Sequence, residues 1–240
     1  MSAAFKLEVE HLAAGYGDVQ VLWEVTINIQ PSEVVCLVGS NGAGKTTFMR
    51  CVSGLLPVRA NIFRLDGRDM TNARPADFVA AGVAHVPEGR RLFRAMSVRD
   101  NLLMGAYLRT DADEVPRDLD RIYSIFPVLA ERRRQDAGTL SGGEQQMCAI
   151  GRALMGRPSL LLIDELSLGL SPRIAEQLVE SLRIINKEGV AILLVEQDVV
   201  IALEFAQRAF VMDRGRITMS GEAANLAADP AIREAYMGLS

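Results

Sequence analysis

Gly39-Ser40-Asn41-Gly42-Ala43-Gly44-Lys45-Thr46 is the most informative stretch of the chain, because it fits the phosphate-binding loop pattern GxxxxGK[ST]. It lies after an apolar run at residues 34–38 and opens a helical pattern over residues 44–53. Glycines let backbone N–H groups close around phosphate oxygens, and the helix N-terminus adds its positive dipole end. Lys45 is expected to reach the terminal phosphates and Thr46 to ligate Mg²⁺. We interpret the stretch, extended to Thr47, as a nucleotide site.

A second apolar run ends in two acidic residues, Leu160-Leu161-Leu162-Ile163-Asp164-Glu165. A nucleotide-hydrolysing site needs a second metal ligand and a group that activates water. Asp164 is expected in the Mg²⁺ shell, and Glu165 is expected to orient or deprotonate the attacking water. A strand that ends in Asp-Glu is commonplace and is usually only a solvated strand end. Beside a phosphate-binding loop, the catalytic interpretation is favoured.

The segment Leu140-Ser141-Gly142-Gly143-Glu144-Gln145-Gln146 predicts the start of a helix. Ser141 is the candidate N-cap, and Glu144 three residues later completes a capping box. Gly142 and Gly143 leave backbone N–H groups exposed at the positive end of that helix. These residues alone leave two interpretations open, an ordinary capped helix and a second phosphate-binding surface.

Apolar runs that alternate with helical patterns predict a parallel α/β core. The continuous runs at 34–38, 160–163 and 191–195 are typical of strands buried on both faces. Further strands are expected at 5–11, 19–29, 61–65 and 83–86, with a β-hairpin over 208–220. Helices are expected at 44–53, 98–108, 144–155, 173–186 and 199–206.

Residues from about 90 to 155 interrupt this alternation, because they are rich in arginine and helical patterns and contain no good strand. We therefore predict one domain over residues 1–240. Its α/β core, with an N-terminal antiparallel β subdomain, spans about 1–89 and 156–240, and a helical subdomain is inserted at about 90–155.

Composition excludes several classes of protein. The 240 residues are 49% hydrophobic and 23% charged, which is the balance of a globular protein and not of a disordered or collagen-like chain. The formal net charge of −4 disfavours a bulk electrostatic contact with nucleic acid. Cys36, Cys51 and Cys148 lack metal-ligand spacing, so we expect three buried, reduced thiols. No apolar run is long enough to span a bilayer, and residues 1–11 do not fit a secretory signal.

The three motifs in this order resemble the ATP-binding cassette (ABC) family, whose signature LSGGQ is matched here by Leu140 to Glu144. The resemblance covers nearly the whole chain and implies a P-loop NTPase (RecA-like) fold with ATP and Mg²⁺ as cofactors. It also implies a head-to-tail dimer, in which Ser141, Gly142 and Gly143 contact the ATP held by Lys45 of the partner cassette.

Three further site residues are carried over from the same resemblance. Tyr16 matches the aromatic residue that stacks on adenine, although a lone tyrosine is more often surface or core packing. Glu88 occupies the position of a metal-linked switch glutamine, and Gln197 that of a switch histidine. Glu88 still offers an oxygen to Mg²⁺. Gln197 can donate a hydrogen bond to a γ-phosphate, but it cannot carry the proton that a histidine could.

These variants, with Ser167-Leu168-Gly169-Leu170-Ser171-Pro172, resemble the second ATP-binding subunit of branched-chain amino-acid importers. Two residues depart from the pattern. Leu166 replaces an expected proline after Asp164-Glu165, and Ala60 lies near a common glycine position. We expect Leu166 to loosen its loop modestly, with activity retained.

The resemblance implies an ATP hydrolase that energises a bacterial importer of leucine, isoleucine and valine. Its implied partners are a second cassette, in a heterodimer or an isolated homodimer, two integral-membrane permease subunits and, indirectly, an extracytoplasmic solute-binding protein. The expected location is peripheral, at the cytoplasmic face of the plasma membrane. Contacts with the permease are expected near residues 88–110, and no nucleic acid is expected as a partner.

Other functions stay open from the sequence. An importer of urea, amides or other amino acids is the nearest alternative. A soluble ABC ATPase acting on ribosomes or DNA is another, although such proteins usually carry two cassettes or long coiled-coil insertions. A regulatory module that holds ATP without turnover is the third.

Several residues have ordinary structural interpretations. Arg132, Arg133 and Arg134 are expected on a solvated helix face. Arg90, Arg91 and Arg94 are equally compatible with a solvated face and with docking to the permease. Four apolar residues at near-helical spacing are expected mainly in the core of the helical subdomain: Leu102, Leu103, Tyr107 and Leu108.

Overall fold

The continuous apolar runs form the centre of a six-stranded sheet in the computed structural model, which describes residues 5–234. The strand order is β10-β9-β3-β8-β7-β6. Neighbours from β9 to β6 pair in parallel, and the edge strand β10 pairs antiparallel with β9. The bounds are β3 Val34–Val38, β6 Val83–Val86, β7 Leu160–Asp164, β8 Ala191–Glu196, β9 Arg208–Asp213 and β10 Arg216–Glu222.

Both faces of this sheet are covered, as the sequence predicts. Every residue of β3, β7 and β8 is buried. Along β3, Cys36 belongs to the core beneath the helices, whereas Val35 and Leu37 belong to the core shared with the other sheet. The three cysteines are free and buried, which confirms the prediction.

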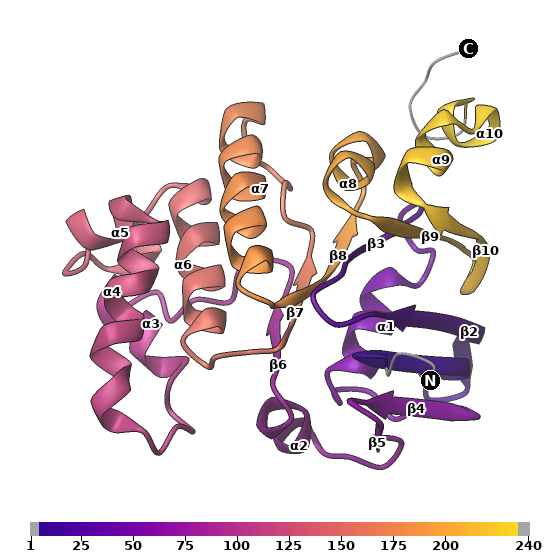
Figure 1. Cartoon of the computed structure of the whole chain (residues 1–240), viewed down its shortest axis with the longest axis horizontal. Coiled ribbons are helices and arrows are strands. Elements are labelled where there is room, and N and C mark those ends of the chain that lie inside the picture. The colour runs from indigo at the N-terminus through magenta and orange to yellow at the C-terminus, as the bar shows by residue number, and fades with distance from the viewer. Residues whose placement is uncertain (1–4, 235–240) are drawn as a thin grey trace.

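A second, antiparallel sheet of order β2-β1-β4-β5 lies beside the first, at the right of Figure 1. Its strands are β1 Leu7–Tyr16, β2 Val19–Ile29, β4 Ile62–Leu65 and β5 Arg68–Asp69. Helix α1, Lys45–Val52, packs between the two sheets through Phe48 and Met49, which are fully buried. The sheets and the phosphate-binding segment are therefore held together by one helix.

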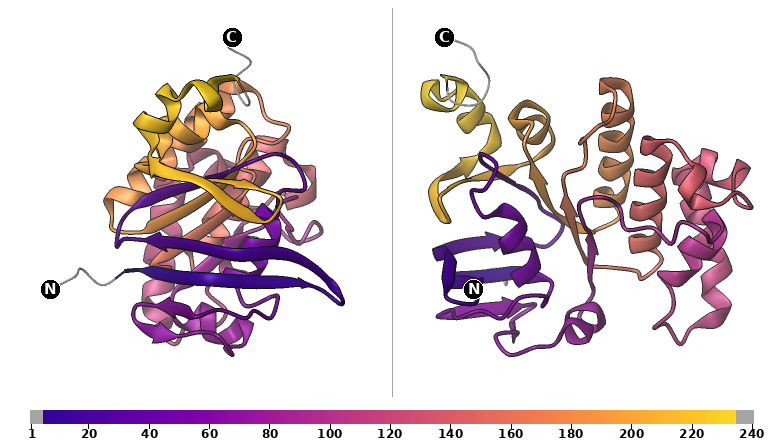
Figure 2. Two further views of the ribbon diagram at one scale, coloured as in Figure 1. Left: turned by 90° about the vertical axis from the view of Figure 1, so that its right-hand side faces the viewer. Right: turned by 180° about the vertical axis from the view of Figure 1, so that it is seen from behind.

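Helices α3 to α10 lie on the other face of the large sheet or beyond its β6 edge (Figures 1 and 2). Helix α2 differs, because its Phe78 packs in the core shared with the antiparallel sheet. Helices α3 to α6 gather at the end of the molecule opposite the antiparallel sheet. Their bounds, with those of the other helices, are α2 Pro75–Ala80, α3 Val98–Met104, α4 Val115–Ile125, α5 Pro127–Glu131, α6 Gly142–Leu154, α7 Pro172–Lys187, α8 Val199–Phe205, α9 Ala223–Ala228 and α10 Pro230–Ile232. Among the described residues, no helix is both long and apolar enough to cross a membrane.

An ion cluster joins the end of α3 to α4 and to the segment after α6. Asp118 of α4 is 8% exposed and accepts hydrogen bonds from Arg109 at 2.5 Å and from Arg157 at 2.7 Å. Arg109 also donates to the carbonyl of Met155 at 3.0 Å. Burial raises the pKa of Asp118, but the two guanidinium groups outweigh it, so the pKa lies below its ordinary value. The cluster stabilises the helical end of the molecule.

Three predictions of local structure and packing were wrong. The strand expected at residues 5–11 runs from Leu7 to Tyr16, because bulges keep β1 paired with β2 where its apolar alternation is lost. The helix expected at 98–108 ends at Met104, where Gly105 lies against the backbone of Arg152. Leu102 is buried as expected, but Tyr107 and Leu108 are 79% and 65% exposed and do not belong to the core. The prediction for residues 1–11 falls partly outside the described residues.

Candidate functional site

The phosphate-binding loop connects β3 to α1 and closes on its own lysine. Lys45 is buried, and its Nζ donates to the carbonyl oxygens of Gly39 at 2.7 Å and Ser40 at 3.0 Å. Gly44 precedes α1 with φ 110°, a backbone conformation that favours glycine. Burial lowers the pKa of Lys45, and the nearby carboxylates of Glu165 and Asp164 oppose that shift. A single ammonium group thus lies at the centre of the loop.

Asp164 ends β7 beside the start of α1. It is 1% exposed, and its Oδ1 accepts a hydrogen bond from Thr46 Oγ1 at 3.5 Å. Burial raises the pKa of Asp164 to about 6, the Thr46 hydrogen bond lowers it, and the negative charges of Glu165 and Glu88 raise it further. The pair therefore offers a hydroxyl and a carboxylate oxygen, the hard donors that Mg²⁺ prefers, in a place where a bound cation would stabilise the carboxylate.

Glu165 and Gln197 face each other from the ends of adjacent strands. Glu165 has φ 58°, uncommon for a residue other than glycine, and its N–H donates to the carbonyl of Val195 at 2.9 Å. Gln197 Nε2 donates to the Glu165 carboxylate. The left-handed turn after β7 therefore places the carboxylate against the loop that follows β8.

A cavity of about 360 Å³ brings half of the predicted site residues together. Its polar lining unites loop residues with three acidic or amide side chains from distant segments. The lining residues are Val21, Asn41, Gly42, Gly44, Lys45, Thr46, Thr47, Glu88, Glu165 and Gln197. Asp164 lies behind Thr46, and Gly39, Ser40 and Ala43 belong to the same loop without lining the cavity.

Two predicted groups do not line this cavity in the part of the chain that the structure describes. Tyr16 is 42% exposed at the end of β1, and its hydroxyl accepts a hydrogen bond from Arg50 of α1 at 3.0 Å. The Arg50 guanidinium also lies 5.8 Å from the Tyr16 ring centroid. Ser141 to Glu144 start α6 and are likewise absent from the lining.

The predicted capping box at the start of α6 is present. Ser141 Oγ accepts from the N–H of Glu144 at 3.4 Å, and Glu144 Oε2 accepts from the N–H of Ser141 at 2.8 Å. The other carboxylate oxygen of Glu144 pairs with Arg132 at 2.9 Å. Arg132, Arg133 and Arg134 are exposed as predicted, but they lie in the turn after α5 and not on the predicted helix face. The glutamate at this position thus has a structural explanation in the cap and in this ion pair.

Hydrogen bonds from two arginines connect the segment after Glu88 to α6. Arg90 donates to the side chain of Gln146 at 3.2 Å and to the carbonyl of Leu168 at 3.3 Å. Arg152 of α6 donates to the carbonyls of Arg90 and Arg91 at 3.0 and 2.9 Å. The segment containing Glu88 is therefore connected both to the helix that Ser141 caps and to the loop after Glu165.

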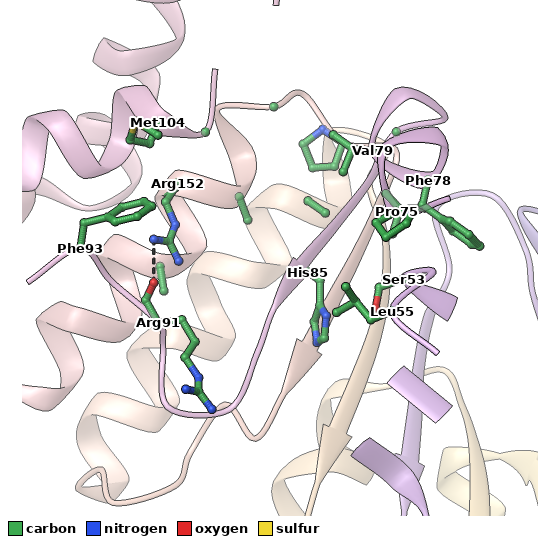
Figure 3. Close-up of a pocket in the computed structure, with 18 residues that line it drawn as sticks. Ser53, Leu55, Pro75, Phe78, Val79, His85, Arg91, Phe93, Met104 and Arg152 are labelled. Carbon is green, nitrogen blue, oxygen red and sulfur yellow. Dashed lines mark hydrogen bonds between the residues drawn. The ribbon is translucent and has the colours of Figure 1, made fainter. Parts of the chain in front are cut away.

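A second cleft, of about 490 Å³, lies between the α2–β6 region and the α3–α6 helices (Figure 3). Figure 3 shows Phe93, Arg152 and Met104 on one side and His85, Leu55 and Val79 on the other. Leu55, Val79, Phe93 and Met104 are 59%, 50%, 47% and 38% exposed. An apolar cleft of this kind is typical of a surface that binds another polypeptide.

Sequence reasoning missed three residues of the site. Val21 lines the cavity although nothing in its strand pattern marks it. Arg152 lies within an ordinary helical pattern, so only the three-dimensional structure reveals its contacts. Glu196 is 1% exposed, and its signal was a glutamate directly after the apolar run 191–195, where a buried strand ends.

Comparisons with known proteins show the family of this chain. Residues 22–167 match the family model described as ABC transporter. The chain is 42% identical to the high-affinity branched-chain amino acid transport ATP-binding protein BraG of Pseudomonas aeruginosa, over 97% of this chain and 99% of that one. It is 33% identical to a probable branched-chain amino acid transport ATP-binding protein, LivF, of Archaeoglobus fulgidus, over the same shares. The solved ADP conformation of an ATP-binding cassette of an ABC transporter has a TM-score of 0.85 at 26% identity, over 98% of this chain and 99% of that one.

Proposed function

The chain belongs to the ABC transporter family and is an ATP-hydrolysing transport subunit of it, and on that premise we propose that it drives an importer of branched-chain amino acids. The observation that carries the hydrolytic part is the cavity in which the phosphate-binding loop, Glu88, Glu165 and Gln197 meet. The names of the relatives BraG and LivF support the substrate class.

Each group of the cavity has a distinct role in the proposed reaction. Lys45 exchanges its loop carbonyl partners for the β- and γ-phosphate oxygens of ATP, and the N–H groups of residues 39–47 surround the same oxygens. Thr46, Asp164 and Glu88 would hold Mg²⁺, which would supply positive charge beside the phosphates. Glu165 orients and deprotonates the attacking water, and Gln197 donates to Glu165 and then to the γ-phosphate.

We assign the remaining predicted residues to a composite site between two cassettes. Ser141, Gly142, Gly143 and Glu144 start α6 but do not line the loop cavity of their own chain within the described residues. The capping box uses the N–H groups of Ser141 and Glu144, and Gly143 is buried, contrary to the exposure expected for Gly142 and Gly143. We assign the N–H groups of these two glycines, at the positive end of α6, to a phosphate of ATP bound to a partner cassette, in a heterodimer or a homodimer. Tyr16, exposed beside α1, stacks on adenine in this arrangement.

The division of the molecule into a core and a helical subdomain is suited to coupling ATP hydrolysis to the movement of a permease. Residues about 1–89 and 156–240 form the α/β core with its β subdomain, and about 90–155 form the helical subdomain. The cleft of Figure 3 lies where these parts meet, and we propose that a permease segment docks there. The arginine contacts described above then transmit its position to Glu88 and α6. The subunit accordingly sits at the cytoplasmic face of the plasma membrane, with two permease subunits and, indirectly, a solute-binding protein.

The catalytic assignment is tested with Glu165→Gln. The variant keeps the size of the side chain but removes its basicity, so it should bind ATP and accumulate as a closed dimer. Turnover should fall by about 100-fold or more, the lower range for a general base. Size-exclusion chromatography with ATP, and a phosphate-release assay, measure the two effects. Hydrolysis at the wild-type rate would remove Glu165 from this role.

The transport assignment is tested by recovering the tagged chain from gently solubilised native membranes. Mass spectrometry should identify hydrophobic permease chains together with a second, different cassette. The complex should then respond to leucine, isoleucine and valine more strongly than to urea or amides. Recovery with ribosomal or DNA-maintenance proteins alone would favour the soluble ABC ATPase and reject transport.

A further inference from the structure

One buried carboxylate near the cavity has no part in the hydrolysis described above. Glu196 is the last residue of β8 and is 1% exposed. It pairs with Val38 of β3, directly before the phosphate-binding loop, while Val195 pairs with Asp164 of β7. Burial raises the pKa of Glu196, and hydrogen bonds oppose that shift. A buried carboxylate is costly unless its oxygens are well hydrogen-bonded.

Two loops supply those hydrogen bonds. Glu196 Oε1 accepts from the N–H of Ser167 at 2.7 Å. Its Oε2 accepts from the Ser167 hydroxyl at 3.0 Å and from the N–H of Gln197 at 3.1 Å. Within residues 5–234 no lysine or arginine forms an ion pair with it, so N–H and O–H groups stabilise the carboxylate.

The same two loops carry the groups that face each other in the cavity. Ser167 lies two residues after Glu165, and Gln197 is the hydrogen-bond donor to Glu165. Between them, Leu166 is 1% exposed and packs in the core beneath the helices. Glu165 itself has a strained φ of 58°, which persists only where neighbouring contacts hold it. The contacts on its C-terminal side are the buried Leu166 and the Glu196–Ser167 pair.

We propose that Glu196 is a positioning residue that holds Ser167 and Gln197 on one carboxylate and thereby fixes the direction of Glu165 towards the phosphate-binding loop. The inference rests on the proposed role of Glu165 as the base. Small displacements of a catalytic group reduce rate steeply. None of the three hydrogen bonds involves the phosphate-binding loop. The charge of Glu196 is the last of the causes that oppose the lowered pKa of Lys45, after burial and the two nearer carboxylates, so Glu196 acts mainly on turnover and little on ATP affinity.

The isosteric variant Glu196→Gln separates charge and hydrogen bonding from packing. Both carboxylate oxygens accept from a backbone N–H, that of Ser167 and that of Gln197. A glutamine amide has one acceptor oxygen and one donor nitrogen, so one of these N–H groups must face another donor in either orientation. The side-chain volume is unchanged, and no cavity is created.

The test compares turnover and ATP affinity in the full-length chain, alone and in the complex recovered from membranes. Glu196→Gln should lower kcat by about tenfold or more, the loss expected for a displaced catalytic group, while the Kd for ATP stays within about twofold. Ser167→Ala, which removes only the hydroxyl contact, should lower kcat by about threefold. The two effects should not add in the double variant, because both residues act through one contact.

A matched control is Glu33→Gln. Glu33 is another buried glutamate, 8% exposed at the start of β3, and it accepts from Arg208 at 3.2 Å and from the N–H of Gln30 at 2.7 Å. Its loss should reduce the urea midpoint of unfolding without changing kcat for the folded protein. A positioning residue and a merely structural one are distinguished by this difference.

A Glu196→Gln variant with unchanged kcat would overturn the inference, whether or not its stability falls. In that case Glu196 would behave like the control residue Glu33, which is only structural. If that variant does not fold, unchanged turnover in Ser167→Ala overturns it equally. Full hydrolysis by Glu165→Gln is a separate outcome, which rejects the base assignment and the positioning role that depends on it. Inactive Glu165→Gln with fully active Glu196→Gln rejects the positioning role alone.

Discussion

Asp164 carries a negative charge into a site where solvent is excluded. It is 1% exposed, and burial is the largest cause that raises its pKa to about 6 from an ordinary value of 3.8. The proton is therefore bound more tightly in the folded protein than in the unfolded chain, and ionisation of Asp164 opposes folding. In the proposed site this unfavourable charge would be offset by a bound divalent cation.

Asp164→Asn should therefore stabilise the chain in the absence of nucleotide and Mg²⁺. The destabilising effect is fully present above pH 6 and disappears as the pH falls below 3.8. The expected gain in free energy of unfolding is about 3 kcal/mol at pH 8 and about half of that at pH 5. Urea unfolding at the two pH values measures it. A gain that is independent of pH would show that charge is not the cause.

Leu166 is the residue at which the chain departs from the expected proline. Its side chain is 1% exposed in the core, so a leucine here is anchored by packing. Leu166→Pro should lower the free energy of unfolding by about 2 kcal/mol through lost packing. Turnover should change by less than about tenfold, because Glu196 still holds the next residue, Ser167. A larger increase in ATPase rate would show that leucine at this position slows the enzyme.

Most residues that line the cavity could be predicted from the sequence, because they belong to short motifs with a fixed spacing between residues. The proposed phosphate contacts of the loop from Gly39 to Thr47 depend on its local backbone, and a strand end places Asp164 and Glu165. Contacts between distant segments could not be derived in the same way. Glu196 receives two hydrogen bonds from Ser167, which is remote in sequence, and no local pattern encodes that contact.

At the scale of elements, the strongest patterns were the buried strands and the helices that follow the motifs. The elements that the sequence did not predict individually were short or polar: β5, α2, α4, α5, α9 and α10. Tertiary contacts determine these elements more than their own periodicity does. Helix α4, for example, is held at Asp118 by arginines on either side of it in the sequence.

Asp118→Asn tests that ion cluster. The amide cannot neutralise Arg109 and Arg157, so the free energy of unfolding should fall by about 2 kcal/mol at neutral pH. The pKa of Asp118 is lowered in the folded protein, so its contribution is present above about pH 4 and is lost as the pH falls below that value. Chemical unfolding at pH 7 and pH 3.5 measures this. An equal deficit at both would contradict an ionic origin.

At the scale of the whole molecule, the cleft of Figure 3 and the nucleotide cavity lie at the two ends of one connecting segment. Glu88 lines the nucleotide cavity, and Arg91 and Phe93 line the cleft. Movement of a partner in the cleft would therefore act on the segment that carries Glu88. If a permease segment docks in the cleft as proposed, this arrangement would connect ATP hydrolysis to the membrane partner without direct contact between the transported substrate and the nucleotide.

Val79→Glu tests the docking surface. Val79 is 50% exposed in the cleft, and a carboxylate there should remove co-purification with the permease while ATP binding by the isolated chain is retained. Ile184→Glu is the matched control, because Ile184 is 49% exposed on α7 and does not line the cleft. Pull-down from solubilised membranes compares the two. Loss of the permease in both variants, or in neither, would contradict docking at the cleft.

The central claim is tested most directly by uptake of radiolabelled leucine into proteoliposomes that contain the complete complex. With ATP on the side of this subunit and the solute-binding protein on the other, leucine, isoleucine and valine should accumulate inside or compete with one another. Replacement of the chain by Glu165→Gln should abolish accumulation while ATP binding remains. A wild-type complex that hydrolyses ATP but accumulates none of these three amino acids would contradict the account.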